Sequence, residues 1–216
     1  MIVGITGGIG SGKSTIARAL AARGFAVYDC DKEAKRIIAE NKDVQQQIIA
    51  LLGPKAFTTP LAPSLEERAG GEVSYNTAYV AQRVFAEPEL LARLNAIVHP
   101  AVKADILQRS PLSPSERGTG GVLFIESAIL YEAGLDEICD RIIQVEAPEE
   151  VRLARTIARD YRGEDTPEHI NKVRARIRAQ KNSAGLSDPR RDVLTILNDG
   201  TRSVSDLAET ILAFIA

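Results

Sequence analysis

The chain has little cysteine and no long apolar run, and both shortages exclude classes of protein. Cys30 and Cys139 are too few for a disulfide framework, and their spacing does not match a zinc site. Scarce cysteine fits a reduced, cytoplasmic compartment. No apolar run approaches the roughly 18 residues needed to span a bilayer, and the start of the chain lacks the features of a secretory signal. The sequence therefore predicts a cytoplasmic protein without a membrane partner.

Charge of either sign is not in excess. Lysine and arginine total 27 and aspartate and glutamate total 29, which gives a net charge of −2. Proteins that bind nucleic acid along its backbone usually show a clear positive excess, so the sequence predicts no nucleic-acid partner. A small anion that is bound locally fits this balance better. The length of 216 residues is enough for one core with insertions.

A glycine-rich stretch near the start of the chain is its most informative motif. Residues 7–14 read Gly-Gly-Ile-Gly-Ser-Gly-Lys-Ser and match G-x-x-x-x-G-K-[ST], the phosphate-binding P-loop. The apolar run Ile2–Thr6 predicts a strand before the loop, and Thr15–Arg23 predicts a helix after it that ends at Gly24. Strand, loop and helix in this order are the context that the motif requires.

The residue types of this loop suit a nucleoside triphosphate. Glycines let successive backbone N–H groups point into one concavity, and the helix N-terminus adds about half a positive charge. Lys13 can reach the β- and γ-phosphates, and the Ser14 hydroxyl can bind Mg²⁺. We expect the nucleotide to contact Gly8, Ile9, Gly10, Ser11, Gly12, Lys13, Ser14 and Thr15.

Five short apolar runs predict a parallel sheet. Each run lacks strict alternation and is rich in Val and Ile, which is typical of parallel strands covered on both faces. Helical patterns separate the runs, so we expect a layered α/β fold of the P-loop NTPase kind. The five runs are Ile2–Thr6, Ala26–Tyr28, Val122–Ile125, Arg141–Val145 and Val193–Leu197.

Two long interruptions break this alternation. The first, residues 32–121, predicts a helical insertion, with helices at 32–40, 43–52, 78–85, 88–97 and 101–109, a loop at 53–76 and a return linker at 110–121. The second, residues 160–191, is dense in charge and contains one polar helix, 167–182, with little apolar face to bury. That helix is either a solvated surface helix or a lid over the nucleotide. The remaining segments, 1–31, 122–159 and 192–216, form the predicted core.

Acidic residues follow two of the predicted strands. Asp29 and Asp31 stand at the end of the second strand, and they share a face if the strand continues that far. Ligands of parallel sheets bind at this edge, so Asp31 can accept the proton of an attacking hydroxyl, although it also fits a helix N-cap. Glu126 ends the third strand in the position of an acid that holds Mg²⁺ through water, or it is a surface acid.

Basic residues and one histidine complete the candidate site. Arg152, Arg155 and Arg159 are spaced to form one helical stripe. Such a stripe can neutralise charge that develops in phosphoryl transfer, or it can be a basic face paired with nearby acids. His99 precedes Pro100, which we expect to break one helix and start the next. His99 contacts either the acceptor substrate or a local backbone group, whereas His169 is expected to be solvated.

A P-loop alone does not separate a kinase from a nucleotide-dependent switch. A guanine-specific switch should show N-K-x-D after a strand, but Asn41-Lys42-Asp43-Val44 lacks the final Asp. The D-x-x-G match at 160–163 follows a predicted helix instead of a strand. Both matches are interpreted as accidental. A kinase is favoured, with a nucleoside or nucleoside-monophosphate kinase as the alternative enzyme and a switch as the alternative of another class.

Taken together, these motifs resemble the dephospho-CoA kinase family. The resemblance rests on residues 6–15, on Asp29-Cys30-Asp31 with Ala34-Lys35, on Arg83-Val84-Phe85, and on Leu94 to Pro100. It continues through residues 126–134, Arg155 to Asp160, Gln180 and Asn198-Asp199-Gly200. Three departures stand out, and one of them is that the segment from Tyr161 to Gln180 is longer than usual. Tyr75-Asn76-Thr77 occupies a place where the family usually has an arginine, and the segment after Glu126 lacks the usual Pro-Leu-Leu.

The resemblance implies ATP-dependent phosphorylation of the ribose 3′-hydroxyl of dephospho-CoA, with Mg²⁺, as the last step of coenzyme A synthesis. It implies a five-stranded parallel core, a helical CoA-binding subdomain (32–121) and a lid (160–191). It also implies roles for single residues: Asp31 as general base, Lys13 and Ser14 at ATP and Mg²⁺, and Arg155, Arg159 and Asn198 near the nucleotide. Arg155 is the expected catalytic cation, and a monomer or small homo-oligomer is expected.

Overall fold

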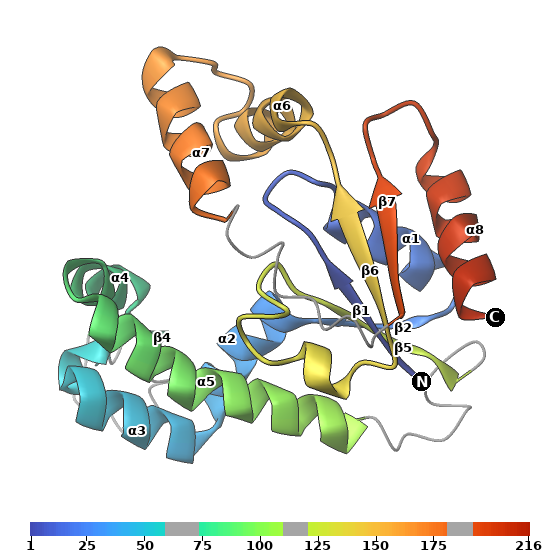
Figure 1. Cartoon of the computed structure of the whole chain (residues 1–216). Coiled ribbons are helices and arrows are strands. Elements are labelled where there is room, and N and C mark those ends of the chain that lie inside the picture. Colours follow the sequence, from blue (N-terminus) through green and yellow to red (C-terminus); the bar gives the residue numbers. More distant parts are fainter. Residues whose placement is uncertain (59–73, 110–120, 181–191) are drawn as a thin grey trace, which may run out of the picture. The chain divides into compact units, whose positions relative to one another are not determined.

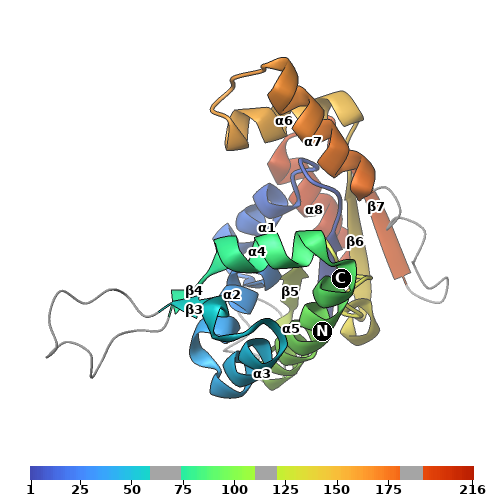
Figure 2. The same cartoon turned by 90° about the vertical axis from the view of Figure 1, so that its left-hand side faces the viewer.

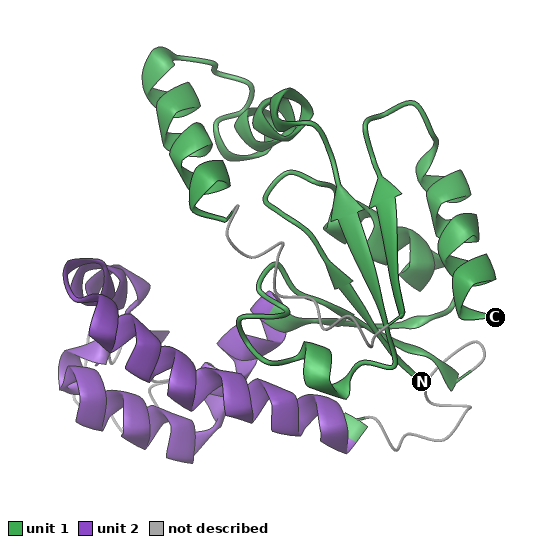
Figure 3. Cartoon of the chain, viewed as in Figure 1, with its two compact units in different colours: residues 1–30, 109–216 green, residues 31–108 purple. Residues whose placement is uncertain are grey.

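The computed structural model describes residues 1–58, 74–109, 121–180 and 192–216. The chain divides into two compact units (Figure 3). Unit 1 comprises residues 1–30 and 109–216, and unit 2 comprises residues 31–108. The predicted linker at 110–121 lies almost entirely outside the described residues. Among the helices that are described, none is both long and apolar enough to cross a bilayer.

A five-stranded sheet forms the centre of unit 1, as the sequence predicts (Figure 1). Every neighbouring pair is parallel, and β1 lies in the middle with all five residues buried. Parallel strands in this position are covered on both faces, which explains the apolar runs. In spatial order the strands are β2 (Ala26–Asp29), β5 (Leu123–Glu126), β1 (Ile2–Thr6), β6 (Arg141–Glu146) and β7 (Asp192–Leu197).

Two helices pack on one face of this sheet and form the main core. They are α1 (Lys13–Ala22) and α8 (Val204–Ile215), which lie next to each other (Figure 1). Apolar residues from both helices meet side chains of the central strands: Val3, Ile5, Ile16, Leu20, Phe124, Leu207 and Ile211. A Ser203–Asp206 capping box fixes the start of α8. This core holds the end of β1 and the start of α1, and therefore the loop between them.

The pair α6 (Glu149–Asp160) and α7 (Pro167–Ala179) has a small core of its own. Leu153 and Ile157 of α6 pack against Val173 and Ile177 of α7, and the two helices lie side by side in Figures 1 and 2. The expectation that the polar helix has little face to bury was wrong. Two β-branched side chains at a spacing of four residues are enough to bury one edge of an otherwise charged helix. We call this pair the α6–α7 hairpin.

Unit 2 consists mainly of helices. Arg36 of α2 ties this helix to α5 through an ion pair with Asp105 at 2.8 Å, and it also contacts Glu33 and Glu40. The predicted loop at 53–76 contains a short 3₁₀ turn, Pro54–Ala56, and two antiparallel strands, β3 (Phe57–Thr58) and β4 (Ser74–Tyr75). The helices are α2 (Cys30–Glu40), α3 (Lys42–Leu52), α4 (Thr77–Ala86) and α5 (Pro88–Arg109).

Helix α5 runs straight through Pro100, so the predicted break at this residue was wrong. Leu90, Leu94, Val102 and Ile106 are buried, and their spacing by multiples of four continues on both sides of the proline. Pro100 itself is exposed. Packing of one continuous apolar face therefore outweighs the hydrogen bond that the proline removes, and the affected turn faces solvent.

Candidate active site

The P-loop joins the end of β1 to the start of α1, as predicted. Gly12 stands at the helix start with a φ of 93°, a left-handed conformation that favours glycine. A Cβ at this position would lie 2.2 Å from Nδ2 of Asn198, so only glycine fits. Within the described part of the chain, no side chain caps the N-terminus of α1. Its backbone N–H groups are thus available to an anion.

Lys13 and Ser14 converge on Glu126 at the mouth of the P-loop. The Ser14 hydroxyl donates to Oε1 of Glu126 at 3.1 Å, and Nζ of Lys13 lies 3.6 Å from the same oxygen. Glu126 ends β5 and is only 8 % exposed. Asp29 of β2 is its register partner, so the two acids stand on neighbouring strands at the same edge of the sheet. Two predicted site residues, Lys13 and Ser14, therefore meet at the carboxylate of a third, Glu126.

Asn198, which follows β7, and Arg155 of α6 support the P-loop. Nδ2 of Asn198 donates to the carbonyl of Ser11 at 2.8 Å. Nη1 of Arg155 donates to the carbonyl of Asn198 at 2.9 Å, and a longer contact of 3.4 Å reaches the carbonyl of Ser11. Asn198 is 5 % exposed. Both residues were predicted near the nucleotide, and the structure places them against the backbone of the loop that would hold it.

Ile9, near the tip of the P-loop, is bound by one side chain from α6 and one from the residue that follows α7. Nε of Arg152 donates to the Ile9 carbonyl at 2.8 Å, and the Ile9 N–H donates to Oε1 of Gln180 at 2.7 Å. Burial lowers the pKa of Arg152. A Cβ at Gly8 would lie 2.3 Å from the guanidinium of Arg152, so glycine there permits the close approach. The sequence suggested Arg152 only as part of a stripe and gave no partner for Gln180.

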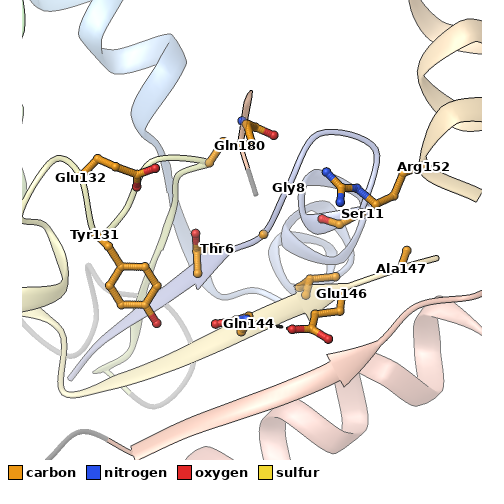
Figure 4. A pocket seen from close by; sticks show the side chains of 13 residues that line it. Thr6, Gly8, Ser11, Tyr131, Glu132, Gln144, Glu146, Ala147, Arg152 and Gln180 are labelled. Atoms are coloured by element: carbon orange, nitrogen blue, oxygen red, sulfur yellow. Dashed lines mark hydrogen bonds between the residues drawn. The ribbon is translucent and has the colours of Figure 1, made fainter. Parts of the chain in front are cut away.

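A cavity of about 240 Å³ opens beside the P-loop (Figure 4). Gly8, Ser11 and Arg152 stand on one side of it, and Gln144 and Glu146 of β6 lie along another. Nε2 of Gln144 donates to Oε1 of Glu146 at 2.9 Å. Neither of these β6 residues stood out in the sequence, because an isolated glutamine or glutamate in a strand carries no motif. The remaining lining residues are Thr6, Gly7, Ala128, Tyr131, Glu132, Val145, Ala147 and Gln180.

The last predicted arginine, Arg159, pairs with its neighbour in sequence. Nε of Arg159 lies 2.6 Å from Oδ1 of Asp160, and Nη1 of Arg176 on α7 lies 2.7 Å from the other oxygen. The hydrogen bond from Arg159 is the main cause that lowers the pKa of Asp160 to about 2. Asp160 therefore links the two helices of the hairpin and orients both arginines.

Asp31 and His99 lie in unit 2. Strand β2 ends at Asp29 and α2 begins at Cys30, so Asp29 and Asp31 do not share a strand face. Asp31 is exposed in the first turn of α2 instead of capping it. His99 is half-buried in the middle of α5. His169 is partly exposed, and its ring also stacks on Tyr161 with the ring centroids 3.9 Å apart, while its Nδ1 bonds the Glu164 carbonyl.

Comparison with known proteins decides the family. The family model for dephospho-CoA kinase matches residues 1–201. The chain belongs to the dephospho-CoA kinase family. A dephospho-CoA kinase from Chlorobaculum tepidum is 36 % identical over 201 residues, covering 93 % of this chain and 88 % of the relative. Another, from Salinibacter ruber, is 37 % identical over 199 residues, covering 92 % and 89 %.

A solved structure of a dephospho-CoA kinase from Campylobacter jejuni has the same fold. Its TM-score is 0.60 at 21 % identity, with 99 % of this chain and 96 % of that chain covered. The family consists of transferases that use ATP and catalyse the last step of coenzyme A biosynthesis. The P-loop kinase fold and the kinase activity expected from the sequence are thereby confirmed.

The mouth of the P-loop offers oxygen atoms of the kind that bind Mg²⁺. No cluster of three or more His, Cys, Asp or Glu side chains suited to a metal occurs among the described residues. Mg²⁺ usually keeps several waters and takes one or two protein oxygens together with substrate phosphates. Ser14 and Glu126, with Asp29 beside them in register, offer oxygens of this kind next to the P-loop.

Proposed function

We propose that the chain transfers the terminal phosphoryl group of ATP to the ribose 3′-hydroxyl of dephospho-CoA, giving coenzyme A and ADP. The observation that carries this proposal is the convergence of Lys13 and Ser14 on Glu126, beside a helix N-terminus that no side chain of the described residues caps. This is the charge arrangement that phosphoryl transfer requires, because the reaction depends mainly on positioning and on stabilising negative charge. The family supplies the acceptor.

Several residues of unit 1 would hold the triphosphate. Backbone N–H groups of the P-loop and the start of α1 would bind phosphate oxygens, and Lys13 would neutralise charge near the transferred group. Asn198 and Arg155 would act through the loop, since both already bond the carbonyl of Ser11. Arg159 would contact phosphates after it leaves Asp160. A direct catalytic contact of Arg155 stays a prediction.

Magnesium would be held by the Ser14 hydroxyl and, through water, by Glu126. When bound, Mg²⁺ neutralises charge on the β- and γ-phosphates. Glu126 is nearly buried and already lies within reach of Ser14, so its carboxylate can orient the hydroxyl before nucleotide arrives. Lys13 near the same oxygen compensates the buried negative charge.

Acceptor chemistry is assigned to unit 2. Asp31 would accept the proton of the 3′-hydroxyl as it attacks, because its exposed carboxylate follows directly after the carboxyl end of β2. His99 would contact the acceptor. The segment 32–121 would bind dephospho-CoA, and residues 160–191 would act as a lid. Cytoplasmic location and a monomer or small homo-oligomer complete the proposal.

A coupled assay of ADP release tests the reaction. The purified chain is given MgATP with dephospho-CoA, adenosine, AMP or no acceptor, and the product is identified by mass. We expect ADP release that depends on dephospho-CoA and a product with the mass of coenzyme A. Turnover with adenosine or AMP alone would replace the proposal by a nucleoside-kinase function. Slow release that is indifferent to every acceptor would favour a nucleotide switch.

A further inference from the structure

The N–H of Ile9 is an unusual place for a side-chain hydrogen bond. Ile9 belongs to the P-loop, whose backbone N–H groups cradle phosphates. In this structure its N–H instead donates to the carboxamide oxygen of Gln180 at 2.7 Å. Gln180 follows the last helical residue of α7, and it is 171 residues away from Ile9 in the chain. A neutral oxygen thus stands where a phosphate oxygen is expected.

The hairpin that carries Gln180 is internally well fixed. Besides its small core, an ion pair of 2.7 Å joins Arg176 to Asp160, and Arg174 lies 3.4 Å from Glu150. Arg152 of α6 also contacts the P-loop, because its Nε donates to the carbonyl of Ile9. Both polar groups of Ile9 are therefore bonded, the carbonyl by a residue of α6 and the N–H by the residue that follows α7. Any movement of α7 relative to the P-loop must break or remake the bond from Gln180.

A second feature shows that the cavity wall is prepared for a polar ligand. The Ser11 hydroxyl lines the same cavity as Gln180, is 1 % exposed as a residue, and its Oγ has no hydrogen-bond partner among the described residues. Buried hydroxyls are almost always satisfied, so a lone one indicates a missing partner. A phosphate oxygen in the cavity would supply an acceptor for this hydroxyl.

We propose that the carboxamide oxygen of Gln180 occupies the phosphate position at the Ile9 N–H until the triphosphate displaces it. A phosphate oxygen is charged and therefore accepts a stronger hydrogen bond from the Ile9 N–H than the carboxamide does. Binding of ATP then exchanges one acceptor for the other and frees the end of α7 from the P-loop. This inference rests on the proposed binding of ATP at the P-loop. It adds a competitor within the chain that lowers the apparent affinity for ATP.

The test compares variants in binding and in amide exchange, neither of which requires acceptor or turnover. Titration calorimetry with Mg²⁺ and a non-hydrolysable ATP analogue gives the Kd, and NMR gives the hydrogen exchange of the Ile9 amide. Gln180→Ala removes the competing oxygen, Gln180→Asn shortens its reach, and Gln180→Glu adds a negative charge. Asn171→Ala removes an exposed amide from α7 and serves as the matched control.

We expect Gln180→Ala and Gln180→Asn to bind the analogue about 2- to 10-fold more tightly, the range set by one hydrogen bond. Gln180→Glu should bind at least about 10-fold more weakly, because a carboxylate competes better and repels phosphate. Ile9 exchange should be faster in Gln180→Ala without ligand and equally slow in both proteins with ligand. Asn171→Ala should match wild type.

An equal or weaker affinity in Gln180→Ala, in a protein whose melting curve matches that of the control, would overturn the inference. Unchanged exchange of the Ile9 amide without ligand would do the same. Failure of the wild-type chain to bind the analogue is a different result, since it would overturn the proposed function itself. If Gln180→Ala does not fold, the opposite shifts expected for the Asn and Glu variants decide the question.

Discussion

Replacing Asn198 by alanine tests whether the P-loop depends on support from β7. The variant removes the 2.8 Å bond to the Ser11 carbonyl and the weaker contact with Arg155. Because Asn198 is 5 % exposed, little water can replace these bonds. A buried group that loses its partner costs about 1–3 kcal/mol. A central value of about 2 kcal/mol lowers the Tm of a chain of this size by roughly 4–8 °C.

The same loss should appear in nucleotide binding. A loosened loop must be ordered again when ATP binds, and about 2 kcal/mol corresponds to a KM for ATP raised by roughly 30-fold. Thermal unfolding without nucleotide and steady-state kinetics measure the two effects, with Asn171→Ala as an exposed amide control. A raised KM together with an unchanged Tm would refute the reasoning, because Asn198 would then contact the nucleotide directly instead of supporting the loop.

Three further predictions concern other parts of the chain. Asp31→Asn should lower kcat by roughly 10²-fold or more with little change in ATP affinity; a kcat near wild type would remove Asp31 as the base. Hydrogen bonding to Arg159 and Arg176 lowers the pKa of Asp160 from 3.8 to about 2. The ionised carboxylate therefore stabilises the fold above about pH 4. This contribution disappears as the pH falls toward 2. The difference in unfolding free energy between wild type and Asp160→Asn should therefore be about 1 kcal/mol at pH 7, after allowance for solvent screening, and should vanish near pH 2. A difference that stays constant with pH would contradict this prediction. Pro100→Ala restores a helical N–H in α5 and should raise the unfolding free energy by about 1–2 kcal/mol, measured by denaturant titration, whereas a decrease would show that the proline is needed.

The sheet could be predicted well because its signals are local. Each strand appears as a short apolar run, and the P-loop motif determines the loop and the helix after β1. Pro100 shows where local signals fail. The proline suggested a break, but burial of Leu94 and Val102 on one face keeps α5 continuous. That outcome depends on tertiary packing, which the local sequence does not contain.

The site was predictable in its motif residues and not in its partners. Lys13, Ser14 and Glu126 were expected from their positions in the motif and at a strand end. The bonds that fix Ile9 come from Arg152 and Gln180, which are 143 and 171 residues away along the chain. A single sequence gives no distance between such residues. Their pairing results only from the packing of the α6–α7 hairpin.

The central position of β1 has a consequence for the synthesis of the protein. Ile2 pairs with Leu123 and Val3 pairs with Arg141, so β1 is made before either of its sheet neighbours and waits for more than 100 further residues. At about 5–20 residues per second, this delay lasts roughly 6–30 s. Residues 31–108 are complete earlier and form a compact unit. Until those neighbours are made, the apolar side chains of β1 have no partner in the sheet, and chaperone binding to this segment would limit aggregation.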